Sequence, residues 1–369
     1  MLQSILLSTL TLCGCGAIQA CRGTQRLAVS TTPKRAVVTD VDGTLFSFAG
    51  RDLSPGNRKA LQACAALGVH VCLATGRIPG PWVDTLRQEL PFLGPCVFGN
   101  GAIVMDADGE LIWTTQLPSE IVSTVLEYTR GGTAGVGGAR LCVLAATRWD
   151  EGGSHGGVRY CELSPGGFPS DVTRLIERAG EPDAVLLPSL DGFEERAVIK
   201  FVIWTSPGVD GWASMPATVT SLSTALDGTG ATILDHGERW CEVLPPGVNK
   251  GSGVLRLLEH LGVPPADTLA CGDAENDVEM LRLVGLGAAV ANAQPDALAA
   301  ADVIVASNVD DGVADAVRRF VLPQAAAAEA AATNTVWRGR LARRRLARRR
   351  KAARGGARRH LKEFGVHPA

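Results

Sequence analysis

The sequence VVTDVDGTLF, residues 37–46, decides the fold. An apolar run enters this stretch from Arg35 and predicts a buried β-strand that ends at Asp40. A second carboxylate follows at Asp42, and Gly43 then permits a turn that a residue with a side chain would resist. Acid pairs before a glycine also form ordinary turns, so the stretch alone leaves a structural interpretation open. Two carboxylates at a strand end favour chemistry, because one can attack an electrophile while the other transfers a proton.

Alternating helices and strands follow, and they predict a parallel sheet. Ser54-Pro55 is typical of a helix start, and Val69–Ala74 and Pro95–Phe98 are further apolar strands. This alternation indicates an α/β fold with a doubly wound, Rossmann-like sheet, whose ligands bind at the carboxyl ends of the strands. Thr75-Gly76-Arg77 follows the second strand, and Asn100 follows the third. A hydroxyl before a glycine can meet an anion through Oγ and free N–H groups, although a capped turn has the same sequence.

The same pattern resumes near Glu242 and carries two more polar groups. Lys250 stands where a helix begins and opposes the helix dipole, so it is either solvated or held for an anionic ligand. An apolar strand then leads into residues 273–277, DAEND. Carboxylate oxygens are the ligands that Mg²⁺ prefers, and three acids exceed what helix capping needs. We therefore expect a metal site after this strand.

Taken in order, these four sites resemble the four motifs of the haloacid dehalogenase (HAD) superfamily. The stretch Asp40-Val41-Asp42-Gly43-Thr44 resembles the first motif, Thr75 the second, Lys250 the third and residues 272–277 the fourth. Several flanks are similar to the Cof-type subfamily, namely Asn100-Gly101-Ala102, Lys200 before Phe201-Val202-Ile203, Pro246–Gly251, Ala291-Asn292-Ala293 and Asp311–Ala314. The resemblance covers residues 35–320.

The resemblance implies a Mg²⁺-dependent phosphatase that acts through an aspartyl-phosphate. Asp40 would be the nucleophile and Asp42 the general acid and base, while Thr75 and Lys250 would hold the phosphoryl oxygens. Magnesium would be bound by Asp40, the backbone carbonyl of Asp42 and Asp273, with Asp277 in support. The residues implied around the substrate are Thr44, Gly76, Arg77, Asn100, Lys200 and Asn276. The substrate would be a small phosphorylated metabolite, such as a sugar phosphate or a phosphorylated cofactor.

The predicted domain organisation follows from where the motifs stop. We expect a Rossmann-like catalytic core from residues 35–116 and 244–322, interrupted by an inserted α+β cap domain over 117–243. In the resembling subfamily such a cap closes over the site, and leaving-group specificity would reside there. Residues 1–34 are expected to be a targeting leader or a disordered extension, and residues 323–369 an Ala-rich linker with a basic, Arg-rich tail.

The two ends differ from the body in charge. Residues 1–34 contain no Asp or Glu, and their scattered Arg, Ser and Thr resemble an organelle presequence. A plastid or mitochondrial location follows if the leader is a presequence, and a cytoplasmic one otherwise. The net charge of −2 hides a strongly acidic body and a tail rich in Lys and Arg. A solvated extension, contact with nucleic acid or an anionic membrane, and a nuclear address all fit the tail; no obligate protein partner is evident.

Two alternatives to the phosphatase remain at this stage. A phosphomutase of similar fold would pass the phosphoryl group between substrate positions and would need a bisphosphate activator. A protein that works through its basic tail would bind nucleic acid or a membrane in a salt-sensitive way.

Overall fold

The computed structural model describes residues 33–46, 53–130, 141–148, 158–163, 180–182, 184–186, 192–205, 214–325 and 327. Most of the predicted leader, the tail from residue 328 onward and the Gly-rich stretches 131–138 and 152–157 lie outside the described residues. So do residues 170–179, for which the sequence predicts a helix. Within the described ranges, no helix combines the length and the apolar character needed to cross a membrane.

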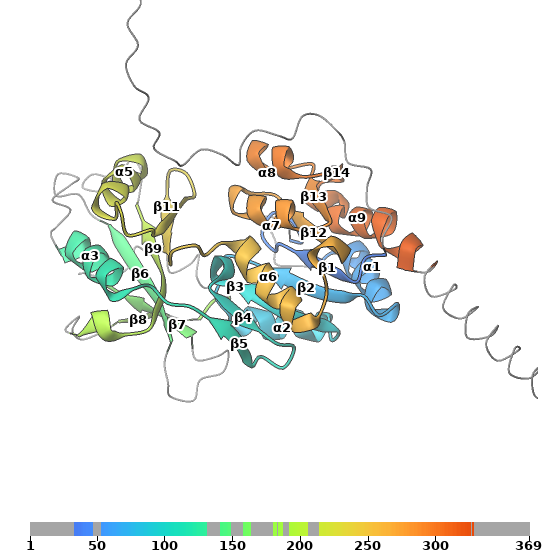
Figure 1. Cartoon of the computed structure of the whole chain (residues 1–369), viewed down its shortest axis with the longest axis horizontal. Helices are drawn as coiled ribbons and strands as arrows, with labels where there is room; N and C mark the ends of the chain where they lie inside the picture. The colour runs from blue at the N-terminus through green and yellow to red at the C-terminus, as the bar shows by residue number, and fades with distance from the viewer. Residues whose placement is uncertain are drawn as a thin grey trace, which may run out of the picture.

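The larger sheet confirms the predicted α/β core. In the described residues this sheet has eight strands in the order β14-β13-β12-β1-β2-β3-β4-β5 (Figure 1). Strands β14 through β3 in this order pair in parallel. Their bounds are β1 Ala36–Thr39, β2 His70–Ala74, β3 Leu93–Phe98, β12 Thr268–Gly272, β13 Leu286–Val290 and β14 Val303–Val305. The first strand, β1, is buried along its whole length between β12 and β2, as its apolar sequence predicts.

One edge of this sheet departs from the parallel pattern. Strands β4 (Ile103–Met105) and β5 (Leu111–Thr114) extend it in antiparallel pairing. The turn between them is closed by Asp106, whose Oδ1 accepts from the backbone N–H groups of Asp108 and Glu110 at 2.9 and 2.8 Å. So short a connection leaves no room for a crossover helix, and the two strands must therefore be antiparallel.

The helices of the core pack in two groups. Helix α1 (Pro55–Ala66) packs against α9 (Gly312–Phe320), and α7 (Val278–Leu283) packs against both α6 (Lys250–Leu261) and α8 (Pro295–Ala300). The remaining core helix is α2 (Pro81–Glu89). Ser54 caps α1 as predicted, because its side chain accepts from the backbone N–H of Asn57 at 3.0 Å.

A second sheet forms the predicted α+β cap and lies beside the core (Figure 1). Its order is β10-β11-β9-β6-β7-β8, with bounds β6 Cys142–Arg148, β7 Val158–Glu162, β8 Ala184–Leu186, β9 Val198–Trp204, β10 Thr232–Asp235 and β11 Trp240–Leu244. Phe201 and Ile203 join a hydrophobic cluster to which helices α3 (Ser119–Arg130) and α5 (Met215–Ala225) contribute. Val202 packs instead with the core cluster, so successive residues of β9 serve opposite faces of the cap sheet.

Candidate active site

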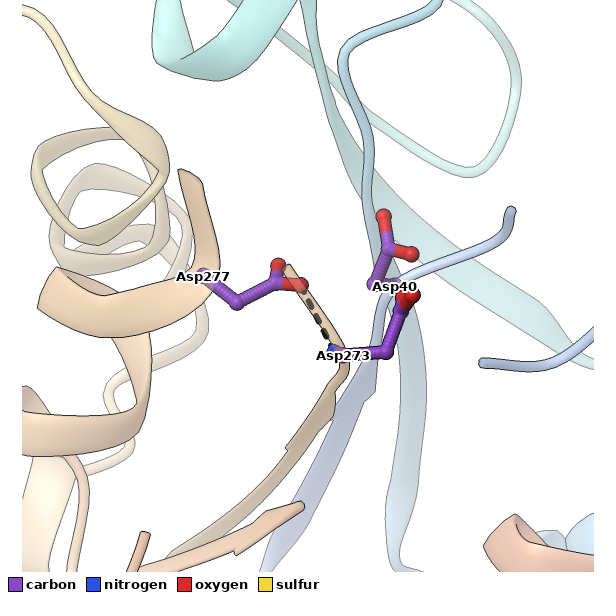
Figure 2. A group of neighbouring side chains, drawn as sticks. All are labelled: Asp40, Asp273 and Asp277. Atoms are coloured by element: carbon purple, nitrogen blue, oxygen red, sulfur yellow. Dashed lines mark hydrogen bonds between the residues drawn. The ribbon is translucent and has the colours of Figure 1, made fainter. Parts of the chain in front are cut away.

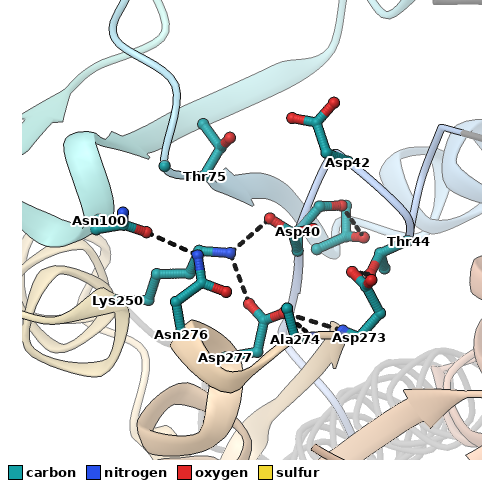
Figure 3. Close-up of polar contacts among 12 residues, drawn as sticks. Asp40, Asp42, Thr44, Thr75, Asn100, Lys250, Asp273, Ala274, Asn276 and Asp277 are labelled. Atoms are coloured by element: carbon teal, nitrogen blue, oxygen red, sulfur yellow. Dashed lines mark hydrogen bonds and ion pairs between the residues drawn. The ribbon is translucent and has the colours of Figure 1, made fainter. Parts of the chain in front are cut away.

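Three neighbouring strands end at the same edge of the core sheet and bring the predicted motifs together. Asp40 follows β1, Thr75 follows β2, and Asp273 follows β12. In the parallel register Thr39 lies opposite both Cys271 and Leu73, so the three strands end nearly level. Figure 3 shows the resulting group of side chains, which come from widely separated parts of the sequence.

Three buried carboxylates lie next to one another in this site. One oxygen from each of Asp40, Asp273 and Asp277 lies within 4.8 Å of the others (Figure 2). Burial raises the pKa of Asp40 well above its usual range, and the charges of Asp277 and Asp273 raise it further. Burial likewise raises the pKa of Asp273 to about 6. Both carboxyl groups therefore hold a proton more readily here than they would in water.

Lys250 is the cation that contacts two of these carboxylates. Its Nζ donates to Asp40 Oδ1 at 2.6 Å and to Asp277 Oδ1 at 2.7 Å. Burial by itself lowers the pKa of Lys250, but Asp277 and Asp40 together raise it above its usual value. The residue stands at the start of α6, where Asn249 and Ser252 form a capping box. The carboxylates explain why a lysine is stable at the unfavourable end of a helix dipole.

Asp277 and Thr44 fix the loop that carries Asp273. The second oxygen of Asp277 accepts from the backbone N–H groups of Asp273 and Ala274 at 2.9 and 3.0 Å. Thr44 Oγ1 donates to Asp273 Oδ1 at 2.7 Å. Thr44 was predicted beside the substrate, and in this structure its hydroxyl orients a carboxylate of the acidic cluster.

Asp42 lies apart from the acidic cluster. Its side chain is 45% exposed and is held by Arg77, which donates through Nε to Oδ2 at 2.7 Å and through Nη2 to Oδ1. The Arg77 guanidinium also lies 5.1 Å from the ring centroid of Trp82. Burial lowers the pKa of Arg77, but its hydrogen bonds and charge contact with Asp42 give a net increase. The metal contact predicted for Asp42 is through its backbone carbonyl, so the position of the side chain does not bear on that contact.

Thr75 and Gly76 follow β2 and lie at the edge of the site opposite Asp273. Thr75 is buried, and its Oγ1 accepts from the backbone N–H of Arg77 at 3.2 Å. A Cβ added to Gly76 would lie 3.0 Å from Nδ2 of the Asn100 side chain, so any residue larger than glycine would press on Asn100. Figure 3 places Thr75 across the site from Asp273 and on the same side as Asp42.

Asn100 and Asn276 are joined to each other. Asn100 has a φ of 54°, a left-handed conformation that asparagine tolerates better than most residues. Its Oδ1 accepts from Nδ2 of Asn276 at 2.9 Å, and its Nδ2 donates to Glu242 Oε2 at 2.8 Å. Oδ1 of Asn276 is buried and has no hydrogen-bond partner among the described residues.

Lys200 reaches this region from the cap. Its Nζ donates to the carbonyl oxygen of Gly76 at 2.7 Å and to Glu242 Oε1 at 2.9 Å. Sequence reasoning singled out Lys200 but missed Glu242. A signal was present, because Glu242 is a lone acid within the otherwise apolar strand Trp240–Leu244, and a buried charge needs a partner.

Comparison with known proteins gives a family match over more than half of the chain. The model of the family described as haloacid dehalogenase-like hydrolase matches residues 37–136 and 209–317. Among solved structures, a sugar phosphatase of HAD subclass IIB superposes with a TM-score of 0.61 at 22% identity, covering 78% of this chain and 98% of that one. At this level of identity the likeness concerns the fold.

Two curated relatives extend the comparison. The chain is 28% identical over 273 residues to an HMP-PP phosphatase of Yersinia pestis, which covers 71% of this chain and 85% of that protein. It is 30% identical over 292 residues to a protein of Arabidopsis thaliana named endoribonuclease YBEY, chloroplastic. That match covers 77% of this chain but 46% of the Arabidopsis protein, so the chain spans about half the length of this relative.

Proposed function

Because this chain belongs to the haloacid dehalogenase-like hydrolases, we propose that it hydrolyses a small phosphate ester with Asp40 as the nucleophile. The family match confirms the membership predicted from four motifs. The observation that carries the proposal is the contact of Lys250 with Asp40 at 2.6 Å, inside a buried group of carboxylates at the strand ends. A carboxylate beside a buried ammonium group is suited to receive an anionic phosphoryl group.

The proposed reaction has two steps, transfer of the phosphoryl group to Asp40 and its hydrolysis. In the first, an Asp40 oxygen forms a bond to phosphorus, the ester P–O bond breaks, and Asp42 gives its proton to the leaving oxygen. In the second, water attacks phosphorus, Asp42 takes a proton from that water, and the bond to Asp40 breaks with release of inorganic phosphate. Thr75 and Lys250 would hold the phosphoryl oxygens in both steps. The carboxylate of Asp42 is 45% exposed whereas Asp40 is buried, so Asp42 is the one of the two that can exchange protons with water once it leaves Arg77.

The acidic cluster fits a divalent cation, and we propose that the cation is Mg²⁺. Asp40, Asp273 and Asp277 carry three negative charges when ionised, whereas Lys250 supplies one positive charge. The deficit of two matches the charge of Mg²⁺, which prefers carboxylate oxygens. Asp40 and Asp273 would hold the ion, since Asp277 already accepts from Lys250 and two backbone N–H groups. Such an ion offsets repulsion between an anionic nucleophile and a phosphate.

Phosphate release by the full-length protein tests this proposal. The substrates would be sugar phosphates, nucleotides, flavin mononucleotide, pyridoxal phosphate and HMP-PP, each with and without Mg²⁺ and beside the variant Asp40→Asn. We expect Mg²⁺-dependent turnover that the variant lacks. Turnover that persists in Asp40→Asn would overturn the role of Asp40. No turnover from a folded protein that binds Mg²⁺ would count against a phosphatase of general small esters and would favour the mutase, which a bisphosphate activator would reveal.

The substrate class and the location are proposals of the same kind. An HMP-PP phosphatase among the relatives supports a small phosphorylated metabolite as the substrate. The name of the Arabidopsis relative describes it as chloroplastic, which supports an organellar location for this chain. A fluorescent protein fused after residue 34 would enter an organelle if the leader is a presequence, and would stay in the cytoplasm if it is not.

A further inference from the structure

Lys200 and Glu242 form an ion pair that is buried on the core-facing side of the cap. Lys200 lies on β9 and Glu242 on the adjacent β11, and Nζ is 2.9 Å from Oε1. Both side chains are 2% exposed. Taking two charges out of water costs desolvation energy that their attraction often fails to repay. Stability alone is therefore a poor explanation for the pair, and its other contacts matter more.

Cap side chains hold the backbone of the loop that carries Thr75. Lys200 donates to the carbonyl oxygen of Gly76 at 2.7 Å. Two residues further on, the N–H of Ile78 donates to Oε1 of Glu181 at 3.0 Å. A carbonyl and an amide of one core loop are thus fixed by charged groups from the other domain. Charge-assisted hydrogen bonds of this kind are short and directional, so they define where the loop lies.

Glu242 extends the same connection to the other side of the site. Its Oε2 accepts from Asn100 Nδ2 at 2.8 Å. The backbone N–H of Asn100 in turn donates to the carbonyl oxygen of Thr75 at 3.0 Å, and its side chain accepts from Asn276. The ion pair is therefore connected to the Thr75 loop and, through Asn100, to the side-chain amide of Asn276.

We propose that Lys200 and Glu242 are positioning residues, through which the cap sets the geometry of the phosphate-binding loop Thr75–Arg77 and of Asn100. This inference rests on the proposed phosphatase function. It differs from the expectation that Lys200 contacts substrate, and it assigns two of the three N–H donors of the ammonium group to protein acceptors. Glu242 lies two residues before the end of β11, where the chain returns to the core. A rotation of the cap about its linkers displaces this point less than the far end of the sheet.

The test compares three variants of the full-length protein. The double variant Lys200→Met/Glu242→Gln removes both charges of the pair together, and the amide oxygen of the new glutamine can still accept from Asn100. Glu242→Asp keeps the charge but shortens the side chain, so that it no longer reaches Lys200 and Asn100 at once. Thr205→Val is the control, because Thr205 directly follows the same strand and, among the described residues, its hydroxyl donates to carbonyl oxygens of the cap at Glu238 and Arg239.

Steady-state kinetics separate positioning from substrate contact. We expect kcat to fall between about tenfold and one-hundredfold in the double variant, with KM changed less than about threefold, because small misplacement of catalytic groups is costly. Glu242→Asp should move kcat in the same direction by a smaller factor, and Thr205→Val should leave it unchanged. A raised KM with unchanged kcat would instead make Lys200 a substrate contact and overturn the proposal.

Hydrogen exchange provides a readout that needs no turnover. In the double variant, backbone amides in peptides covering residues 72–80 and 97–103 should exchange at least about tenfold faster, whereas Thr205→Val should leave them as in the wild type. Unchanged exchange in both peptides would refute the inference even if the enzyme is active. Faster exchange with a wild type that hydrolyses no ester would support the positioning contact while the proposed function fails, so the two failures are distinguishable.

Discussion

Lys250→Met removes the cation from a buried group of three carboxylates and should destabilise the fold strongly. The ammonium group of Lys250 lies 2.6 Å from Asp40 and 2.7 Å from Asp277, and its side chain is 1% exposed. Methionine keeps much of the length and volume of lysine but not the charge. Removing one partner of a buried ion pair costs about 3–5 kcal/mol, because the remaining charge is left uncompensated. We expect a loss of this size in the free energy of unfolding at pH 7.5.

Arg58→Met is the matched control for this substitution. Arg58 pairs with Glu89 on the surface, where the two side chains are 46% and 30% exposed. Exposed ion pairs contribute about 0–1 kcal/mol, so this variant should lose less than about 1 kcal/mol. Both changes replace a long cationic side chain by methionine, and the difference between them therefore reports burial.

The dependence of the loss on pH follows from the raised pKa of Asp40. Lys250 lowers that pKa against the effect of burial, so the variant raises it further. An acid with a raised pKa in the folded state favours folding progressively more as the pH falls through that pKa toward the ordinary value. The deficit of Lys250→Met should therefore shrink between pH 7.5 and pH 5.

Urea unfolding followed by tryptophan fluorescence, at both pH values and with and without Mg²⁺, measures these effects. Added Mg²⁺ should stabilise Lys250→Met more than the wild type, because the variant cluster lacks a positive charge. A loss equal to that of Arg58→Met, or a deficit that is independent of pH, would refute the electrostatic account of the cluster.

Three further predictions follow from the site. Asp277→Asn should lose about 1–3 kcal/mol in urea unfolding, because Asp277 accepts from Lys250 with one oxygen and from two backbone N–H groups with the other, and an amide has one oxygen. Gly101→Ala should lower the melting temperature more than Gly68→Ala: both have positive φ, but a Cβ at Gly101 would lie 2.0 Å from a backbone oxygen, and at Gly68 it meets open space. Equal shifts would contradict the close contact. Calorimetric titration should show Mg²⁺ binding about tenfold weaker at pH 5 than at pH 7, because Asp273, with a pKa of about 6, must first release a proton; affinity that does not change with pH would argue against Asp273 as a ligand.

The strand-end residues could be predicted from sequence because their signals are local. Asp40, Thr75 and Asp273 each follow directly on a short apolar run, and parallel strands place their carboxyl ends at one edge. Lys250 was found in the same way, from its place at a helix start. The sequence did not show that Lys250 contacts both Asp40 and Asp277, since that depends on how α6 packs against the loop after β12.

The contacts between cap and core could not be predicted because they depend on register. Lys200 and Glu242 meet because β9 pairs with β11 so that Glu242 lies opposite Val202, two residues from Lys200 on the same face. A shift of one residue would turn Glu242 toward the cap helices. The pairing of Arg77 with Asp42 likewise joins two loops whose residues were predicted separately.

A buried ion pair at the seam between cap and core does what an apolar contact cannot do. Apolar burial is non-directional, so it would tolerate sliding of the cap over the core. Lys200 and Glu242 instead bond one backbone carbonyl and one side-chain amide, at 2.7 and 2.8 Å, and each bond restricts direction as well as distance. The site needs such restriction at Thr75, because a phosphoryl group is stabilised only by donors that are already in place when charge develops. The pair therefore costs desolvation energy but fixes the position of the loop. For this reason the double variant Lys200→Met/Glu242→Gln should keep its free energy of unfolding and have a lower kcat.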